Sequence, residues 1–153
     1  MSIHGPPRIA VVVQHLVHAE AAGVLFTRNP ATGARERLIE AAWGLGEAVV
    51  SGAVVPDSYR LSPEGNVLER SIGVKDVALS VSPDGGASEV AVEPSRIHAE
   101  VLNDSDLAAL NRLTLQCEEV FGEDLDIEWA FESGTLYLLQ CRSITRTGTR
   151  AGK

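Results

Sequence analysis

The sequence has few of the features that mark several common protein classes. It contains no run rich in lysine and arginine, and lysine occurs only at Lys75 and Lys153. Acidic residues outnumber basic residues 21 to 13, for a net charge of −8, so nothing in the charge favours a nucleic-acid partner. A phosphorylated ligand would therefore need arginine, backbone N–H groups or a metal ion gathered at one place.

Cysteine and long apolar runs are also scarce. Cys117 and Cys141 are the only cysteines, and they form no CxxC pattern, which argues against a zinc site. The longest apolar stretch, residues 9–17, contains Gln14 and His15 and is too short to span a bilayer. The first residues lack the layout of a signal peptide, so we expect a cytoplasmic protein with no membrane partner.

The length and composition suit a single folded unit. The 153 residues are 44% hydrophobic and 22% charged, which is enough apolar material for a core. We expect a flexible lead-in over residues 1–7, a folded region over 8–146 and a flexible tail over 147–153.

Local patterns predict several strands and few helices. Strands are expected over residues 8–17, 21–27, 37–42, 57–61, 67–73 and 89–92, the last inside a loop that spans 80–94. A short helix is expected from Glu47. A long helix is expected over 103–121, capped by Asn103 or Asp104 and ended by Gly122. Its expected apolar stripe is Leu107, Leu110, Leu113, Leu115 and Val120.

The segment DIEWAFESGTLYLLQCR, residues 126–142, alternates strongly between apolar and polar residues and predicts a closing hairpin. We expect a three-residue loop around Gly134, which would take positive φ and set Glu132 opposite Leu136. This register puts Leu136 and Leu138 on the same face as the polar groups of the hairpin.

Four of those polar groups pair across the predicted hairpin. Glu128 then faces Gln140, and Asp126 faces Arg142. A carboxylate with an amide oxygen can hold Mg²⁺, an arginine can fork onto phosphate oxygens, and the neighbouring leucines can line a base. The alternative is an ordinary open sheet face with a cross-strand Asp126–Arg142 ion pair. Periodicity alone favours that alternative, because charged residues are common on open faces.

Four segments occur in one order along the chain: IAVVVQHLV, AAGVLFTRNPATG, IEAAWGLGEAVVSGAVVPDSY and DIEWAFESGTLYLLQCRSITR. Together they resemble the ATP-binding domain of the phosphoenolpyruvate synthase (pyruvate, water dikinase) and pyruvate phosphate dikinase family, a domain that rifampicin phosphotransferases share. The resemblance covers about residues 8–146. It implies an α+β fold, namely the C-terminal subdomain of an ATP-grasp domain, with a mainly antiparallel sheet, few helices, and ATP and Mg²⁺ as ligands.

The resemblance also assigns roles residue by residue. The matching nucleotide-site positions are Gln14, His15, Leu16, Glu128, Gln140 and Arg142. Glu128 and Gln140 match the Mg²⁺ ligands, and Arg142 matches the catalytic arginine that contacts the phosphates and helps transfer. The first three residues match the hinge that meets the adenine, largely through backbone groups. The alternative for Gln14 is a polar residue that ends a core strand.

Several other residues stay without an assigned role. Gly44 and Gly46 lack the further glycine of GxGxxG and any Walker lysine, so neither a dinucleotide fingerprint nor a P-loop is present. Glu47 lies near the reacting phosphates or simply begins a helix, Arg28 faces phosphate or loop solvent, and Lys75 is expected to be a solvated loop lysine.

The four histidines are not expected to carry phosphate. They are His4, His15, His18 and His98, and none stands in a Thr/Ser-x-His motif. The resemblance implies two parts that this sequence does not contain. One is an N-terminal subdomain, which supplies a lysine and a loop over the phosphates, and the other is a phosphohistidine domain.

The leading hypothesis is therefore the Mg-ATP-binding portion of a pyruvate, water dikinase-type phosphotransferase that is inactive as an isolated chain. The alternatives are part of a rifampicin phosphotransferase-type enzyme, a nucleotide-binding module without turnover, and an interaction domain with a decayed site.

Overall fold

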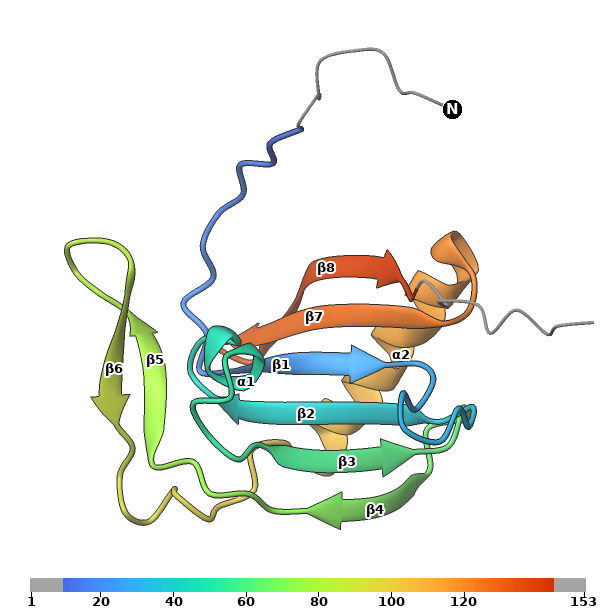
Figure 1. Cartoon of the computed structure of the whole chain (residues 1–153), viewed down its shortest axis with the longest axis horizontal. Helices are drawn as coiled ribbons and strands as arrows, with labels where there is room; N and C mark the ends of the chain where they lie inside the picture. Colours follow the sequence, from blue (N-terminus) through green and yellow to red (C-terminus); the bar gives the residue numbers. More distant parts are fainter. Residues whose placement is uncertain (1–9, 145–153) are drawn as a thin grey trace, which may run out of the picture.

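Alternating buried and exposed positions organise the chain around one antiparallel sheet. The computed structural model describes residues 10–144. Its elements are β1 Ala21–Phe26, β2 Arg37–Trp43, α1 Glu47–Val50, β3 Asp57–Leu61, β4 Val67–Ser71, β5 Val77–Val81, β6 Ala87–Ala91, α2 Asp104–Phe121, β7 Leu125–Glu132 and β8 Thr135–Ser143. Six strands form one sheet in the order β4-β3-β2-β1-β7-β8, while β5 and β6 form a separate hairpin (Figure 1). The predicted α+β class with a mainly antiparallel sheet is confirmed.

The core lies between one face of the sheet and α2, which runs behind it in Figure 1. Leu25, Ile39 and Trp129 are fully buried on that face. The central strand β1 has β2 on one side and β7 on the other. At Gly23, β1 lies very close to the β2 backbone and to the Trp129 ring. A Cβ there would meet the Glu40 carbonyl oxygen at 1.8 Å and Trp129 Cζ2 at 2.9 Å. No other residue type fits this position without moving backbone atoms.

The long helix begins and ends where its capping residues predict. The Asn103 side chain accepts hydrogen bonds from two backbone N–H groups of the first turn, and Gly122 follows the last turn at φ 83°. The predicted stripe is only half right, because Leu115 and Val120 are exposed. The stripe instead continues from Leu110 through Thr114 and Cys117, as 3.6 residues per turn requires, and both are buried.

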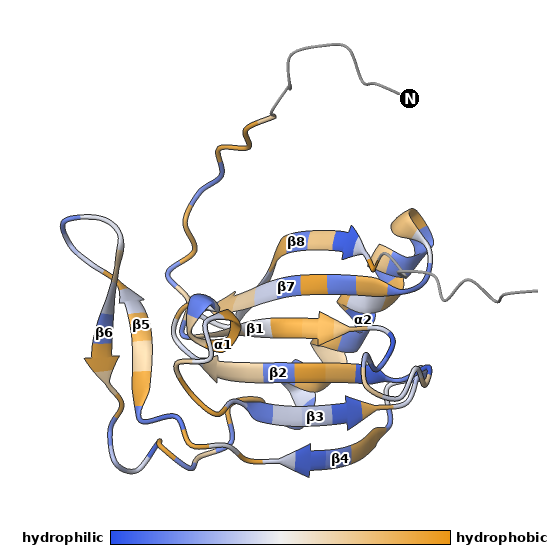
Figure 2. Cartoon of the chain, in the orientation of Figure 1, coloured by the Kyte–Doolittle hydropathy of each residue, from blue (hydrophilic) through white to orange (hydrophobic). Residues whose placement is uncertain are grey.

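The predicted strand over residues 8–17 is wrong where the structure describes it. Residues 10–17 form no strand, and Val11, Val12 and Val13 are 82%, 81% and 93% exposed. Both edges of the following strand β1 are already paired with β2 and β7, so this apolar run cannot pair with β1. It leads away from the sheet in Figure 1 and keeps its apolar colour in Figure 2. The predicted lead-in over 1–7 and the tail over 147–153 lie outside the described residues.

A second error concerns the loop predicted over residues 80–94. Strands β5 and β6 pair in register there, with Val81 opposite Ala87. Gly85 and Gly86 both take positive φ in the turn, at 85° and 83°. Val77 and Leu79, which precede the predicted loop, pack against the cluster that α1 forms beside the sheet, so tertiary packing supports β5. The other predicted strands and the short helix are confirmed to within two residues.

A buried ion pair joins β3 to two connecting segments. The Lys75 ammonium and the Asp57 carboxylate form it, and both side chains are 0% exposed. Asp57 also accepts hydrogen bonds from the backbone N–H groups of Gly73 at 2.9 Å and Val101 at 2.8 Å, and from the Tyr59 hydroxyl at 3.2 Å. Lys75 is thus not the solvated loop lysine that the sequence suggests. Burial of a charge is tolerated here because four donors converge on one carboxylate.

We expect Lys75→Met to lower the free energy of unfolding by about 3–5 kcal/mol, because it leaves the Asp57 carboxylate buried without its counter-charge. Urea unfolding with an unchanged m-value measures this loss. Arg112→Met, at an exposed position of α2, is the control and should change stability by less than about 0.5 kcal/mol. Equal effects of the two substitutions would contradict a stabilising role for the pair.

Gly23→Ala should lower the free energy of unfolding by about 3 kcal/mol or more, because its methyl group overlaps the Glu40 carbonyl. The matched control is Gly46→Ala, whose Cβ would lie 3.6 Å from the Ala22 Cβ, an ordinary contact. That substitution should cost less than about 1 kcal/mol. The same urea titration measures the free energy of unfolding of both variants. A Gly23→Ala variant as stable as the unmodified chain would show that β1 and β2 can move apart.

Candidate functional site

The sheet face opposite α2 carries the candidate site in three successive rows. Directly opposite residues of antiparallel strands share a face, so β1, β7 and β8 each contribute one residue to a row. The rows are Ala22, Ala130 and Tyr137; then Val24, Glu128 and Gln140; then Phe26, Asp126 and Arg142. Each step of two residues advances about 7 Å along the strands. The face therefore changes from small and apolar at one end to charged at the other.

The first row lies under an apolar pocket of about 140 Å³. Ala22 and Ala130 are small, which leaves room above the sheet. The residues that enclose this room come from three separate parts of the chain, and they include Gln14, His15, Leu16, Leu45, Gly46 and Leu139. The three predicted hinge residues are thus brought to one wall of a pocket.

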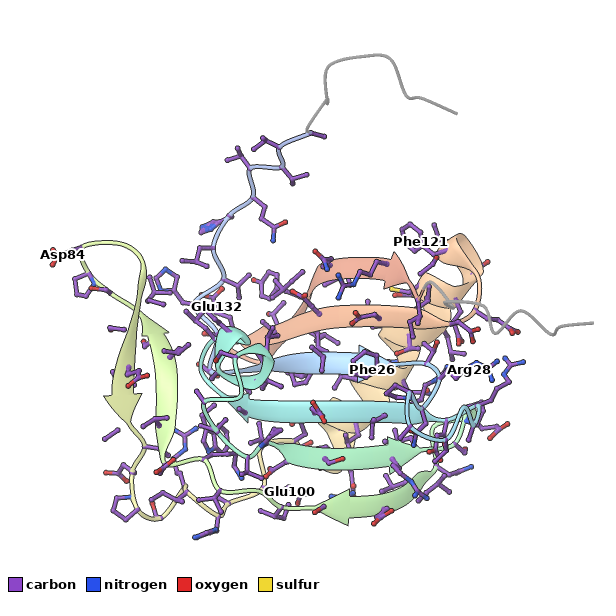
Figure 3. The ribbon with its side chains drawn as sticks, viewed as in Figure 1. Phe26, Arg28, Asp84, Glu100, Phe121 and Glu132 are labelled. Carbon is purple, nitrogen blue, oxygen red and sulfur yellow. The ribbon has the colours of Figure 1, made fainter. Side chains whose placement is uncertain are left out.

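Two hydrogen bonds attach the hinge segment to the end of β7. The His18 backbone N–H donates to Glu132 Oε1 at 3.1 Å, and the Glu20 N–H donates to the Phe131 carbonyl at 2.9 Å. Figure 3 labels Glu132 at the foot of this segment. Residues 14–16 lie outside any strand, so their backbone groups can face a ligand rather than a sheet neighbour.

The second row places the predicted metal ligands side by side. Gln140 Nε2 donates to Glu128 Oε1 at 3.3 Å, and Glu128 lines a second pocket of about 340 Å³ together with Glu47 of α1. Turning the Gln140 amide over would present its oxygen beside the carboxylate, which gives two hard oxygen donors. Within residues 10–144 no three His, Cys, Asp or Glu side chains surround one point. The donor set fits Mg²⁺, which leaves its other positions to water and phosphate.

The third row holds Arg142 against Asp126. Arg142 Nε and a terminal guanidinium nitrogen approach Asp126 Oδ2 at 2.8 and 2.7 Å. The Asp126 hydrogen bond and charge raise the pKa of Arg142, and its side chain remains 64% exposed. The guanidinium is therefore held at the sheet face with donors left for an anion from solvent.

The hairpin reaches the predicted pairs by a different geometry. Its turn has two residues, Ser133 and Gly134, with φ of 50° and 75°, so Glu132 pairs with Thr135. A bulge beside Glu128 then shifts the register by one residue and restores the predicted Glu128–Gln140 and Asp126–Arg142 pairs.

The turn and the bulge together change the predicted position of the leucines. Leu136 lies opposite Phe131 and packs against the core cluster on the α2 side. Leu138 lies opposite Trp129 but is 43% exposed and lines a pocket beside the hinge residues. Leu139 lines that pocket and the two described above. Alternation along the sequence contains no signal for the bulge.

Of the residues left without a role by the sequence, some lie in loops and one lines a pocket. Arg28, at the end of β1 in Figure 3, donates to the Gly33 carbonyl of its own loop at 2.7 Å and to Oδ1 of Asp124, which precedes β7, at 2.6 Å. Glu47 is exposed and lines the second pocket. His18 and His98 are exposed, while His4 lies outside the described residues.

Sequence reasoning missed the contribution of Leu45 and Gly46 to the pockets. In the sequence, the one feature that could have indicated this role is the Gly-rich stretch that contains both residues.

The sheet face thus offers an apolar pocket at one end, and a carboxylate, an amide and an arginine toward the other. Comparison with known families shows what the chain is similar to. Residues 3–153 match the model of the pyruvate phosphate dikinase, AMP/ATP-binding domain, and the chain belongs to this family. The α+β fold described above and its ATP-grasp-like assignment are consistent with that family.

Named relatives are enzymes much longer than this chain. The probable phosphoenolpyruvate synthase of Methanothermobacter thermautotrophicus is 43% identical over 146 residues, which is 95% of this chain and 21% of that protein. Phosphoenolpyruvate synthase of Pyrococcus furiosus is 38% identical over 152 residues, 93% of this chain and 19% of that protein. Rifampicin phosphotransferase of Bacillus cereus is 38% identical over 143 residues, 93% of this chain and 16% of that protein. The chain thus spans about a fifth or less of these relatives.

Among residues 10–144, neither helix combines the length and the apolar character that crossing a membrane requires.

Proposed function

We propose that the open sheet face binds Mg-ATP, and that the chain is the ATP-binding portion of a pyruvate, water dikinase-type phosphotransferase. The order of the three rows carries this proposal. The base of Mg-ATP needs an apolar pocket, its metal ion needs oxygen donors, and its phosphates need an arginine. The sheet face offers these groups in the same spatial order along the strands. Membership of the AMP/ATP-binding family supports the same ligand.

Each part of the face then has a distinct task. Backbone groups of Gln14, His15 and Leu16 meet the base, while Leu139 packs against it. Glu128 and Gln140 hold Mg²⁺, which when bound would offset phosphate charge and help to fix its orientation. Arg142 contacts the phosphates and stabilises the charge that transfer develops, which makes it the catalytic residue of this chain.

The phosphates would lie on an open face, so turnover needs further protein. We propose that an ATP-grasp N-terminal subdomain and a phosphohistidine domain complete the enzyme, in the same parent chain or in trans. Two observations support this. The valines at 11–13 are almost fully exposed, as expected of a surface that another subdomain covers, and the relatives are several times longer. The folded boundaries at 8 and 146 and a cytoplasmic location remain predictions of the sequence.

An antibiotic phosphotransferase is the second candidate, because the Bacillus cereus relative is 38% identical. It differs from a dikinase in the phosphoryl acceptor, and the residues described here would meet only the nucleotide. A binding module without turnover is the third. Supplying the family's N-terminal subdomain as a separate chain distinguishes it, since ATP turnover would return only for a part of an enzyme.

Calorimetric titration with ATP, with and without Mg²⁺, tests the proposed function. We expect Mg²⁺ to strengthen binding to the unmodified chain. Glu128→Ala should weaken Mg-ATP binding roughly ten- to a hundredfold, equivalent to about 1.5–3 kcal/mol, and metal-free binding far less. Glu69→Ala, which removes the same charge from the exposed edge strand β4, is the control. Equal losses with and without Mg²⁺ would reject the metal role, and absence of any ATP binding would reject a working site in the isolated chain.

Arg142→Ala should weaken ATP binding about tenfold and AMP binding by less than about threefold, because AMP lacks the outer phosphates that the guanidinium would contact. Competition of ATP or AMP with a fluorescent nucleotide measures the two dissociation constants. Arg112→Ala on the opposite side of the sheet is the matched control and should change neither. An equal loss for AMP and ATP would place Arg142 near the base rather than the phosphates.

A further inference from the structure

Two thiols that are distant in the sequence meet between α2 and β8. Cys117 is 4% exposed and belongs to the main core cluster. Cys141 lies opposite Ile127 on the α2 side of β8 and packs against the same cluster. Both cysteines are free, and both contribute to the same packed cluster between the helix and the sheet. The C-terminal part of α2 passes beside β8 (Figure 1). The proposed nucleotide site uses neither sulfur.

The two thiols differ in their access to solvent. Cys141 is only partly buried, because β8 is an edge strand of the sheet. Burial, together with the neighbouring Cys141 thiol, raises the pKa of Cys117 to about 11. An oxidant from solvent therefore meets Cys141 first, and Cys117, packed in the same cluster, is the one other cysteine of the chain.

We propose that Cys117 and Cys141 form an oxidisable dithiol, at which a hydroperoxide oxidant produces an intramolecular disulfide. The Cys141 sulfur attacks one oxygen of hydrogen peroxide, the O–O bond breaks, and one water and a sulfenic acid result. The Cys117 sulfur then attacks the Cys141 sulfur, the S–O bond breaks, and the hydroxyl group leaves as a second water with the Cys117 proton. Two thiols lose two hydrogen atoms in total, and one peroxide becomes two waters.

A disulfide here would act on the proposed nucleotide site, and this part of the inference rests on the proposed function. Cys141 stands between Gln140 and Arg142, whose side chains occupy the opposite face of β8. Disulfide geometry requires the two Cα atoms to lie within about 7 Å and the Cβ vectors to face each other. A disulfide that holds β8 to α2 within these limits would shift Gln140 and Arg142 relative to Glu128 and Asp126.

The first experiment treats the full chain with stoichiometric hydrogen peroxide under native conditions. We expect loss of both free thiols, a mass lower by two hydrogen atoms, and one linked peptide pair containing Cys117 and Cys141. Cys117→Ser should instead leave Cys141 as a sulfenic or higher acid, and Cys141→Ser should leave Cys117 as a free thiol. A native chain that retains the Cys117 thiol while Cys141 is over-oxidised, or that links Cys141 between two chains, would overturn the proposal.

The second experiment measures ATP binding to the reduced and oxidised chain. We expect at least a threefold weaker affinity after oxidation, reversal by dithiothreitol, and no change in the Cys117→Ser, Cys141→Ser double variant. If the chain that carries the disulfide binds ATP with unchanged affinity, the proposed effect on the nucleotide site is wrong, while disulfide formation itself stands. If the reduced chain binds no ATP, the proposed function of the isolated chain fails, while the thiol and mass results still decide the dithiol.

Discussion

The register of three neighbouring strands, β1, β7 and β8, is the constraint on which the rest of the structure depends. β1 pairs with β7 so that Val24 lies opposite Glu128, and β7 pairs with β8 so that Glu128 lies opposite Gln140. Because side chains alternate with a period of two, a slip of one residue would send Glu128 into the α2 core and turn Trp129 outward. Burial of Trp129 and Leu25 on the α2 side therefore fixes which side chains lie on the polar face.

The close approach at Gly23 and the buried Asp57–Lys75 pair stabilise the same frame from different sides. Gly23 lets β1 and β2 lie close enough for Trp129 to pack across them. Asp57 holds the segments that follow β4 and precede α2, so α2 is attached at its start to the strand layer. Gly23 also lines the second pocket beside Glu128, so the close packing of β1 reaches the proposed site, whereas the Asp57–Lys75 pair acts from the buried side of β3.

The proposed site is enclosed at one end and open at the other. Residues 14–16, Leu45 and Gly46 enclose the apolar pocket, whereas the Arg142 side chain at the other end is 64% exposed. Charge-assisted contacts gain strength when water is excluded, and an open face excludes little. A second subdomain would supply that exclusion, and the exposed valines of the hinge segment are consistent with such a partner.

The sequence alone determined the closing hairpin and its Glu128–Gln140 and Asp126–Arg142 pairs, although the two-residue turn and the bulge that produce this register were seen only in the structure. Capping residues likewise determined both ends of α2. Tertiary structure alone decided the bulge that turns Leu139 toward the pockets, the burial of Lys75, and the failure of residues 10–17 to form a strand. The physical reason is common to all three: each depends on which distant neighbour fills a space or satisfies a backbone or charged group, and local periodicity contains no record of distant neighbours.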